Sequence, residues 1–301
     1  MRRYAWLVPV LLLPLLGQVP DQVDIELDGK PFTTFHCGAT EGKPYFAPIR
    51  SASGKIVTRR YPMEKVEGES HDHLHHRGLW FSYDDVNGVK FWENDPSYTN
   101  PHIGRIVATK VDWKPGAKSL KSDFDWNDHS GNTVLKEHRV VRFQSSPTLR
   151  IMDFYITLTA AKDVVFGDTK EGAFAIRLAD ALTEKRGSGK MVNAEGKQGM
   201  ANVWGKRSNW VDYSGTIDGE QLGVAMFDHP SNPLHPVHWH ARDYGLFALN
   251  PWGSHAFDPS ADVTHLDLRS GKSLRFRWRV VIHEGDTTAA HIGQLYDEFA
   301  K

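Results

Sequence analysis

The stretch LRIMDFYITLTA, residues 149–160, decides the fold of this chain. Successive side chains of an extended backbone point to opposite sides, so the stretch presents two faces. One face is more polar and carries Asp153. This alternation with a period of two predicts a half-buried β-strand, with Asp153 turned either to solvent or to a ligand-lined surface. The other face is mainly apolar and is expected in the core: Arg150, Met152, Phe154, Ile156 and Leu158.

Strand-like runs of the same kind follow one another along most of the chain. They are short, they alternate or are rich in β-branched and aromatic residues, and turn sequences such as VNGV, HSGN and RSGKS separate them. Turns recur about every 8–12 residues, which is the spacing of sandwiches and barrels. We therefore predict an all-β fold, a large antiparallel β-sandwich. The other expected strands cover residues 23–29, 43–50, 55–62, 78–85, 89–94, 104–114, 134–143, 172–182, 222–230, 243–252, 264–270 and 273–283.

A helical pattern is found at the end of the sequence, in DTTAAHIGQLYDEFAK, residues 286–301. Asp286 or Thr287 can cap the N-terminus of this helix. We expect a short C-terminal helix that packs on a sheet through one apolar stripe. The stripe comprises Ala290, Ile292, Leu295, Tyr296 and Phe299.

The N-terminal residues 1–20 have the features of a signal peptide. Arg2 and Arg3 precede an apolar run, residues 5–16, that is too short to span a bilayer. We expect a periplasmic or secreted protein whose mature part, residues 21–301, is a single β-sandwich domain with no membrane span. The formal net charge of the chain is −1, so it lacks the overall basic field that is typical of nucleic-acid-binding proteins.

The segment ESHDHLHHRGLWF, residues 69–81, concentrates side chains that bind ligands or transfer protons. If its backbone is extended, His71, His73 and His75 point the same way. Histidines at this spacing suit a metal, so His71 and His73 are candidate ligands of a divalent metal. The same cluster, with His76, also fits a metal-free pocket for a sugar or an anion. A solvated polar loop is the third interpretation.

A second pair of alternating histidines, His238 and His240, lies in the stretch FDHPSNPLHPVHWHARDYGLFALNPWG, residues 227–253. Trp239 and Ala241 are expected to face the opposite side of the same strand. The prolines before the pair indicate a long, rigid loop, and long ordered loops in compact domains are usually functional. We hypothesise that this segment and the first histidine segment form opposite walls of one pocket.

Two further segments carry charged residues that need partners if they are buried. In GDTKEGAFAIRLADAL, residues 167–182, Glu171 and Arg177 are candidates to face a ligand, with the turn at the rim of the pocket. Lys206, which lies between Trp204 and Trp210, is a candidate to border a cleft. The sequence contains no P-loop and no HExxH motif, so a nucleotide site or a zinc peptidase site of those types has no support.

Long motifs of this sequence resemble a family of exported bacterial proteins of unknown function that carries the label "methane oxygenase PmoA". The methane monooxygenase subunit of that name is a multi-span membrane protein, which does not fit a chain whose body consists of alternating strands. The motifs are DHLHHRGLWFSYDDVNGVKFW at 72–92, GDTKEGAFAIRLADAL at 167–182, NWVDYSG at 209–215, FDHPSNP at 227–233 and WHARDYGLFALNPWG at 239–253.

The architecture that this resemblance implies is similar to β-sandwich carbohydrate proteins of the galactose-mutarotase kind. Such proteins present histidine and carboxylate groups on a concave sheet face, where they act on sugar rings. The His-Gly-Gly segment of the mutarotase pattern has no clear counterpart here, which argues against anomeric epimerisation itself.

Together, the residues and the resemblance predict a carbohydrate-active protein, an enzyme of the epimerase, lyase or hydrolase type that uses histidine and carboxylate acid–base chemistry. Its expected partner is a sugar or a glycan. The alternatives are a metal-dependent hydrolase or oxygenase with a histidine-rich site, and a non-catalytic sugar-binding module. The catalytic candidates are His75, His76, His240, Glu171 and Asp153, and the substrate-binding candidates are Arg77, Trp80, Arg177, Lys206, His238, Arg242 and Tyr244.

Overall fold

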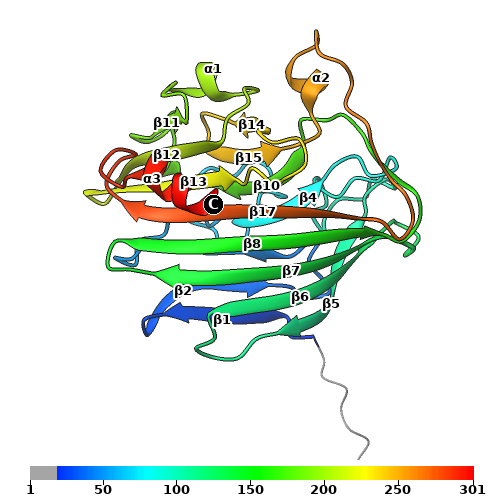
Figure 1. Ribbon diagram of the computed structural model, residues 1–301. Helices are drawn as coiled ribbons and strands as arrows, with labels where there is room; N and C mark the ends of the chain where they lie inside the picture. Colours follow the sequence, from blue (N-terminus) through cyan, green and yellow to red (C-terminus); the bar gives the residue numbers. More distant parts are fainter. Residues whose placement is uncertain (1–18) are drawn as a thin grey trace, which may run out of the picture.

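A computed structural model describes residues 19–301, and two antiparallel β-sheets stacked face to face form its body (Figure 1). The apolar run of the expected signal peptide lies outside the described residues. The first sheet has seven strands. Their order is β1 (Gln22–Leu27), β2 (Lys30–His36), β3 (Tyr45–Phe46), β4 (Leu79–Tyr83), β10 (Gly172–Arg177), β15 (Leu246–Asn250) and β14 (His238–Ala241).

The second sheet has eight strands, and a two-stranded ribbon accompanies it. The order of the eight strands is β11 (Lys190–Asn193), β12 (Trp210–Ile217), β13 (Glu220–Asp228), β17 (Ser273–Glu284), β8 (Leu149–Ala160), β7 (Thr133–Ser145), β6 (Ser119–Asn127) and β5 (Arg105–Asp112). The ribbon pairs β16 (Leu266–Leu268) with β9 (Val164–Phe166). The helical elements are a 3-10 turn at Asp180–Leu182, α1 (Met200–Val203), α2 (Ser254–Phe257) and α3 (Ile292–Phe299). No helix within residues 19–301 is long and apolar enough to cross a membrane.

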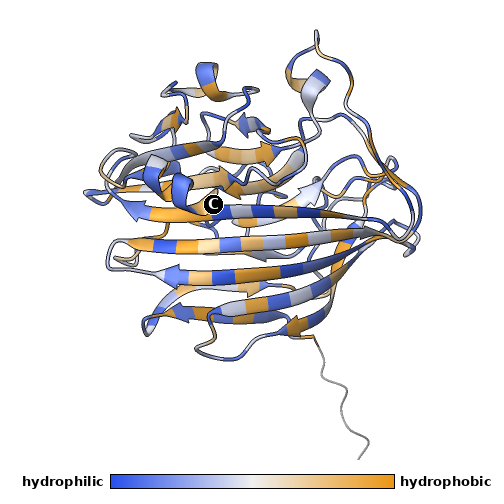
Figure 2. Ribbon diagram, viewed as in Figure 1, coloured by the Kyte–Doolittle hydropathy of each residue, from blue (hydrophilic) through white to orange (hydrophobic). Residues whose placement is uncertain are grey.

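The core lies between the two sheets and follows the predicted alternation. Hydrophobic and hydrophilic residues alternate along the long strands β7 and β8 (Figure 2). Strand β8 has the predicted bounds, and Met152, Phe154, Ile156 and Leu158 on its inward face belong to the core. The all-β antiparallel sandwich predicted from the sequence is confirmed.

Some of the expected strands are absent and some observed strands were not expected. Strands β2, β6 and β12 had not been predicted. Residues 55–62 and 89–94 contain only isolated bridges, such as Thr58 with Leu178 and Lys90 with Ile103. These two segments lie in loops and form no strand ladders, although their side chains Val57, Phe91 and Trp92 are buried.

The C-terminal helix α3 covers the outer face of the eight-stranded sheet (Figure 1). Its buried residues Ile292, Tyr296 and Phe299 belong to the predicted apolar stripe and pack on strands β8, β13 and β17. The predicted start was wrong by several residues, because the Asp286 carboxylate accepts the backbone N–H groups of a separate turn. His291, with a φ of 53°, then separates that turn from the helix.

A buried ion pair between β17 and β12 accepts a hydrogen bond from the turn before α3. His283 Nε2 lies 2.9 Å from Asp212 Oδ1, and the Thr287 hydroxyl donates to Asp212 Oδ2 over 2.6 Å. Burial acts to lower the pKa of His283, but the charge of Asp212 and the hydrogen bond that His283 donates to it outweigh burial and raise the pKa above its ordinary value. His283 therefore binds a proton more tightly in the folded chain than in the unfolded chain.

Replacing His283 with glutamine is expected to reduce the free energy of unfolding more at pH 6 than at pH 9. A group whose folded pKa is raised stabilises fully below its unfolded pKa of about 6.5, and this contribution is lost as pH rises through the folded pKa. Urea unfolding of both proteins at the two pH values measures the difference. The exposed His129→Gln variant is the control and should show no such trend. A loss that is equal at both pH values, or larger at pH 9, contradicts this assignment.

Candidate functional site

The candidate site lies on the face of the seven-stranded sheet that is turned away from the eight-stranded sheet. Alternation along β14 sends Trp239 and Ala241 into the core, as predicted, and leaves His238 and His240 on the outer face. Trp80 of β4 lies on this same outer face, within a separate small apolar cluster. The outer face is therefore a platform on which loop residues can pack.

A cavity of about 360 Å³ on this platform brings together four separate segments of the sequence. The predicted convergence of the two histidine segments, with the turn before β10 at their side, is confirmed by this lining. Glu93, from the loop after β4, had not been singled out. The cavity is lined by His73, His75, His76, Glu93, Lys170, Glu171, His240, Arg242 and Tyr244.

Arg59 holds the first histidine segment in place. Its guanidinium is fully buried and donates to the backbone carbonyls of Asp72 (2.8 Å), His73 (3.0 Å) and His76 (3.2 Å). These three bonds satisfy carbonyl groups of an irregular loop, which would otherwise be costly to bury. Sequence reasoning assigned Arg59 to a strand and missed this role.

The segment that carries His71 and His73 is a turn and not an extended strand. His73 has a left-handed φ of 46°, and the backbone N–H of His76 donates to the carbonyl of His73 over 3.0 Å. His71 is therefore separated from the cavity, and its ring stacks on Tyr61 at 4.6 Å. No group of three or more His, Cys, Asp or Glu side chains within residues 19–301 is arranged to hold a metal ion. The proposed pairing of His71 with His73 as metal ligands was wrong.

Four aromatic rings form a stack beside the cavity. The centroid distances are 5.3 Å from Trp80 to His76, 4.6 Å from His76 to His73 and 5.3 Å from His73 to Tyr244. The ring of His73 lies within 9° of parallel to each of its two neighbours. Since stacking covers the faces of the His73 and His76 rings, these residues meet a ligand through their ring edges, where the nitrogens lie.

Asp72 and His73 form a carboxylate–histidine pair at the cavity. His73 Nδ1 lies 3.1 Å from Asp72 Oδ1, and Arg177 Nη2 donates to the same oxygen over 2.7 Å. Burial acts to raise the pKa of Asp72, but the hydrogen bond with His73 and the charges of Arg177 and Arg59 hold that pKa well below its usual range. Asp72 is therefore ionised and fixes Nδ1 of His73 as the protonated nitrogen.

The other histidines of the cavity are neutral at neutral pH. Burial is the main cause, and it lowers the pKa of His75 to about 2 and that of His240 to about 3. Burial and the nearby positive charges also hold the pKa of His76 well below its ordinary value. Neutral imidazole has one nitrogen that donates and one that accepts, so the protein partners decide the tautomer.

Hydrogen bonds give His76 and His240 opposite tautomers. Arginine can only donate, so His76 Nδ1 accepts from Arg177 Nη1 at 3.3 Å and Nε2 of His76 carries the hydrogen. A carbonyl can only accept, so His240 Nδ1 donates to the Lys170 carbonyl at 2.9 Å and Nε2 of His240 keeps its lone pair. The cavity therefore offers both a donor and an acceptor to a ligand hydroxyl.

Glu171 does not pair with a histidine. Its carboxylate lies 3.0 Å from Lys170 Nζ at the rim of the cavity. The carboxylate that pairs with a histidine of the cavity is Asp72, which is adjacent to His73. Asp72 stands between His71 and His73 in the sequence.

Several predicted site residues lie outside the cavity lining. Arg77 is ion-paired with Glu41 (2.8 Å) and Asp95 (2.6 Å), and Lys206 is exposed on the loop after α1. His238 stacks on Phe257 and bonds the Gly205 carbonyl.

Two of the predicted residues support the cavity from behind. Trp80 is buried under His76, and Arg177 is buried with its guanidinium 4.6 Å from the Tyr244 ring centroid. Neither lines the cavity, so both act through the residues they hold.

Asp153 is remote from the cavity. It lies on the outer side of the eight-stranded sheet, where its carboxylate accepts from Arg279 Nε (2.6 Å) and Nη2 (2.9 Å). Arg279 in turn packs over Phe299 of α3. The prediction of Asp153 as a catalytic group was therefore wrong, because the face opposite the core is covered by the C-terminal helix.

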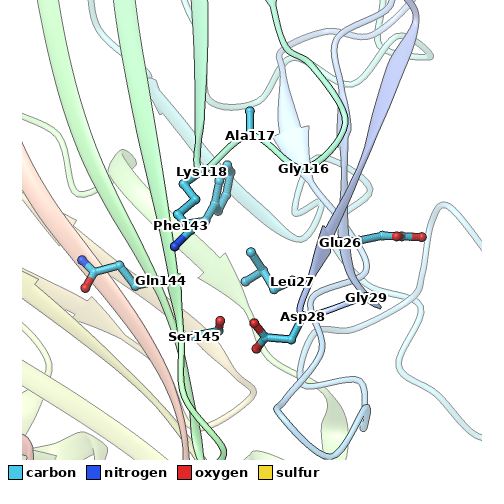
Figure 3. Close-up of a pocket in the computed structure, with 10 residues that line it drawn as sticks. All are labelled: Glu26, Leu27, Asp28, Gly29, Gly116, Ala117, Lys118, Phe143, Gln144 and Ser145. Atoms are coloured by element: carbon cyan, nitrogen blue, oxygen red, sulfur yellow. The ribbon is translucent and has the colours of Figure 1, made fainter.

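A larger cavity of about 580 Å³ lies between the β1–β2 turn and the end of β7 (Figure 3). Leu27 and Phe143 form apolar parts of its lining, and Asp28, Lys118 and Gln144 are polar parts. Glu26 points away from the other lining side chains in Figure 3. The lining includes no histidine, and no acid–base pair is formed there, so the smaller histidine cavity is the better candidate for chemistry.

Comparisons with solved structures return sugar-related proteins at low similarity. The galactosidase domain of an alpha-galactosidase-sucrose kinase has 9% identity and a TM-score of 0.44, with 84% of this chain and 40% of that chain covered. A galactose mutarotase related enzyme from Lactobacillus acidophilus has 11% identity and a TM-score of 0.44, with 88% and 98% covered. A galactose mutarotase-like protein from Lactobacillus casei has 9% identity and a TM-score of 0.41, with 87% and 100% covered.

Sequence comparison identifies the family. No curated protein matches the chain. The model of the Family of unknown function (DUF6807) matches residues 22–297, which is nearly all of the strands and α3. The chain belongs to this family, DUF6807.

Proposed function

We propose that this chain is a carbohydrate-active enzyme that transfers protons to and from a sugar held in the histidine cavity. The observation that carries the proposal is the Asp72–His73 pair, whose histidine lines one cavity with His76, which offers an Nε2–H group, and His240, which offers an Nε2 lone pair. Acid–base catalysis needs a base and a donor within reach of the same ligand, and this arrangement supplies both.

His73 is the proposed general base. Asp72 accepts the hydrogen of Nδ1, so the lone pair of Nε2 is free to take a proton from the ligand. When His73 becomes charged, the ionised carboxylate of Asp72 stabilises the imidazolium. Arg59 and Arg177 keep Asp72 ionised and in place, and they are positioning residues in this scheme.

His76 and His240 are proposed to orient the sugar as neutral hydrogen-bonding groups. A sugar hydroxyl donates one hydrogen bond and accepts others, and the two opposite tautomers match both needs. Tyr244 adds an aromatic edge next to them. The cavity volume of about 360 Å³ lies within the usual range for small-molecule sites.

The geometry favours an isomerase or lyase over a hydrolase. Glycoside hydrolysis ordinarily uses two carboxyl groups that flank the bond. The two glutamates that line the cavity are each ion-paired with a lysine, Glu171 with Lys170 at 3.0 Å and Glu93 with Lys90 at 3.5 Å. Proton transfer by histidine is the chemistry that the remaining groups support.

A panel of neutral and acidic monosaccharides tests the proposal by thermal unfolding and by NMR. A sugar present at about 100 times its Kd is expected to add about 2.7 kcal/mol to stability and to raise Tm by about 5 °C. Incubation of that sugar with the enzyme in D₂O should replace a carbon-bound hydrogen by deuterium, read by proton NMR. If no sugar raises Tm, the sugar assignment is wrong. If a sugar binds but exchanges no hydrogen and forms no product, the catalytic assignment is wrong.

A further inference from the structure

Arg242 differs from the other strong cations around the cavity because it has no acidic partner. Lys170 pairs with Glu171, and Arg59 and Arg177 share Asp72. Within residues 19–301, by contrast, no carboxylate lies within ion-pairing distance of the Arg242 guanidinium, and its Nε is buried without an acceptor. A partly buried charge without a partner is costly, so an anionic group from outside the chain is the natural complement.

Local structure holds the Arg242 side chain ready for a ligand. Its backbone N–H donates to the carbonyl of Leu246 over 2.8 Å, and its carbonyl accepts from the backbone N–H of Gly245 over 3.0 Å. These two bonds fix the turn between β14 and β15. The guanidinium lies 5.9 Å from the Trp204 ring centroid and 5.8 Å from that of Tyr244. Packing against two aromatic rings leaves less conformational freedom to lose when a ligand binds.

The other charged groups of the cavity do not neutralise the charge of Arg242. Both lining glutamates already have lysine partners, and the buried histidines are neutral. Arg242 and His240 line the same cavity, and the charge of Arg242 adds to burial in lowering the pKa of His240. The cavity thus combines hydroxyl-binding groups with the guanidinium of Arg242, which pairs with no carboxylate among residues 19–301.

We infer that the sugar of this cavity is a uronate, whose carboxylate is bound by the guanidinium of Arg242. This inference rests on the proposed function, because it names the class of sugar that the same site takes. The planar guanidinium presents paired N–H donors that match the two oxygens of a carboxylate. The hydroxyls of the sugar ring then face His76 and His240.

A bound carboxylate also defines which hydrogen His73 removes. The carbon that bears the carboxylate, C5 of a hexuronate, is the carbon whose hydrogen is acidified when Arg242 neutralises the adjacent charge. The C5–H bond breaks, its proton passes to Nε2 of His73, and the electron pair is delocalised into the carboxylate. Return of a proton to C5 re-forms the bond, so the step requires no oxidant or reductant. In D₂O the returning proton is deuterium.

Matched pairs of sugars test the inference. Glucuronate and glucose, and galacturonate and galactose, differ only at C6, and titration calorimetry compares their Kd values for the wild-type protein and for Arg242→Gln. We expect at least one uronate to bind at least 10-fold more tightly than its neutral partner. Arg242→Gln should weaken uronate binding by about 10- to 100-fold and neutral-sugar binding little, as for loss of a charge-assisted hydrogen bond. Lys185→Gln removes an exposed charge nearby and should change neither Kd.

The outcomes separate this inference from the function on which it rests. Equal binding of the uronate and the neutral sugar overturns the inference and leaves the proposed function standing. An equal loss of affinity for the two sugars in Arg242→Gln has the same consequence. Tight binding of galactose 6-sulfate in place of both uronates overturns the carboxylate assignment. Deuterium that enters at C1 and not at C5 contradicts the assigned hydrogen. Failure of every sugar to bind overturns both the inference and the proposed function.

The melting temperatures of the ligand-free variants show whether they fold. Arg242→Lys, which keeps the charge but loses the paired donors, should bind uronate with intermediate affinity.

Discussion

Replacing His73 with alanine is expected to lower the rate of hydrogen exchange into the bound sugar by about 10²- to 10⁴-fold, the usual contribution of a general base. Nε2 of His73 is the proposed proton acceptor. No other histidine that lines the cavity has a carboxylate within hydrogen-bond distance of its other ring nitrogen. Because His76 and His240 still bind the hydroxyls, the Kd for the sugar should rise by much less than the rate falls. Exchange in D₂O, followed by proton NMR, measures the rate, and calorimetry measures Kd.

His71→Ala is the matched control for this prediction. It removes the same side chain two residues away, where the ring stacks on Tyr61 outside the cavity. The control should exchange hydrogen at the wild-type rate. Full activity of His73→Ala, or an equal loss in His71→Ala, contradicts the assignment of His73 as the base. Asp72→Asn should also slow the exchange, because asparagine cannot stabilise the charged imidazole.

Replacing Glu137 with glutamine is expected to lower the free energy of unfolding by about 3–5 kcal/mol. Glu137 and Arg139 both point from β7 into the core, and their side chains are at most 1% exposed. The Glu137 carboxylate accepts from Arg139 Nε at 2.7 Å and from Trp126 Nε1 at 2.9 Å. Loss of the carboxylate charge leaves the arginine buried without compensation, which is the cause of the large expected loss.

Urea unfolding measures this effect, with two comparison variants. Lys136 lies next to Glu137 on β7, and Lys136→Gln breaks its exposed ion pair with Asp125 of the neighbouring strand β6, which should cost less than about 1 kcal/mol. The double variant Glu137→Met with Arg139→Met removes both buried charges and should be more stable than Glu137→Gln. A loss below about 1 kcal/mol for Glu137→Gln would show that the pair is not a buried ionic contact.

Alternation is a local property, and for that reason the strands and their faces could be predicted well. The side chains of β8 and β14 point where the two-residue period requires. The unpredicted strand β6 carries the same signal, because Leu120, Phe124 and Trp126 face inward at even spacing. That strand was within reach of sequence reasoning. The expected strand at 43–50 does contain β3, but β3 has only two residues, Tyr45 and Phe46.

The geometry of the histidine segment could not be predicted, because contacts distant in sequence fix it. The extended interpretation of 71–75 failed at His73, whose left-handed backbone is held by hydrogen bonds from Arg59. Arg177, more than 100 positions away, orders Asp72 and sets the tautomer of His76. Periodicity carries no information about such partners.

The partners of buried charged residues also depend on contacts that are distant in sequence. The need for a partner was predicted for Arg177, but its identity was not, since Asp72 is remote in sequence. Asp153 was expected to face solvent or a ligand on the outer face of its strand, yet Arg279 pairs with it across the β8–β17 register. A lone charged residue in a strand therefore signals an ion pair in this fold as readily as it signals a site.

The most direct test of the central claim is a ¹⁵N-histidine NMR spectrum of the protein with and without the sugar that raises Tm most. The claim is that a sugar binds among His73, His76 and His240, so the ring signals of these three residues should shift on addition of the sugar. The signals of His71 and His229, which lie outside the cavity lining, should stay in place. Shifts confined to histidines outside the cavity, or no shift with a sugar that binds, would contradict the account.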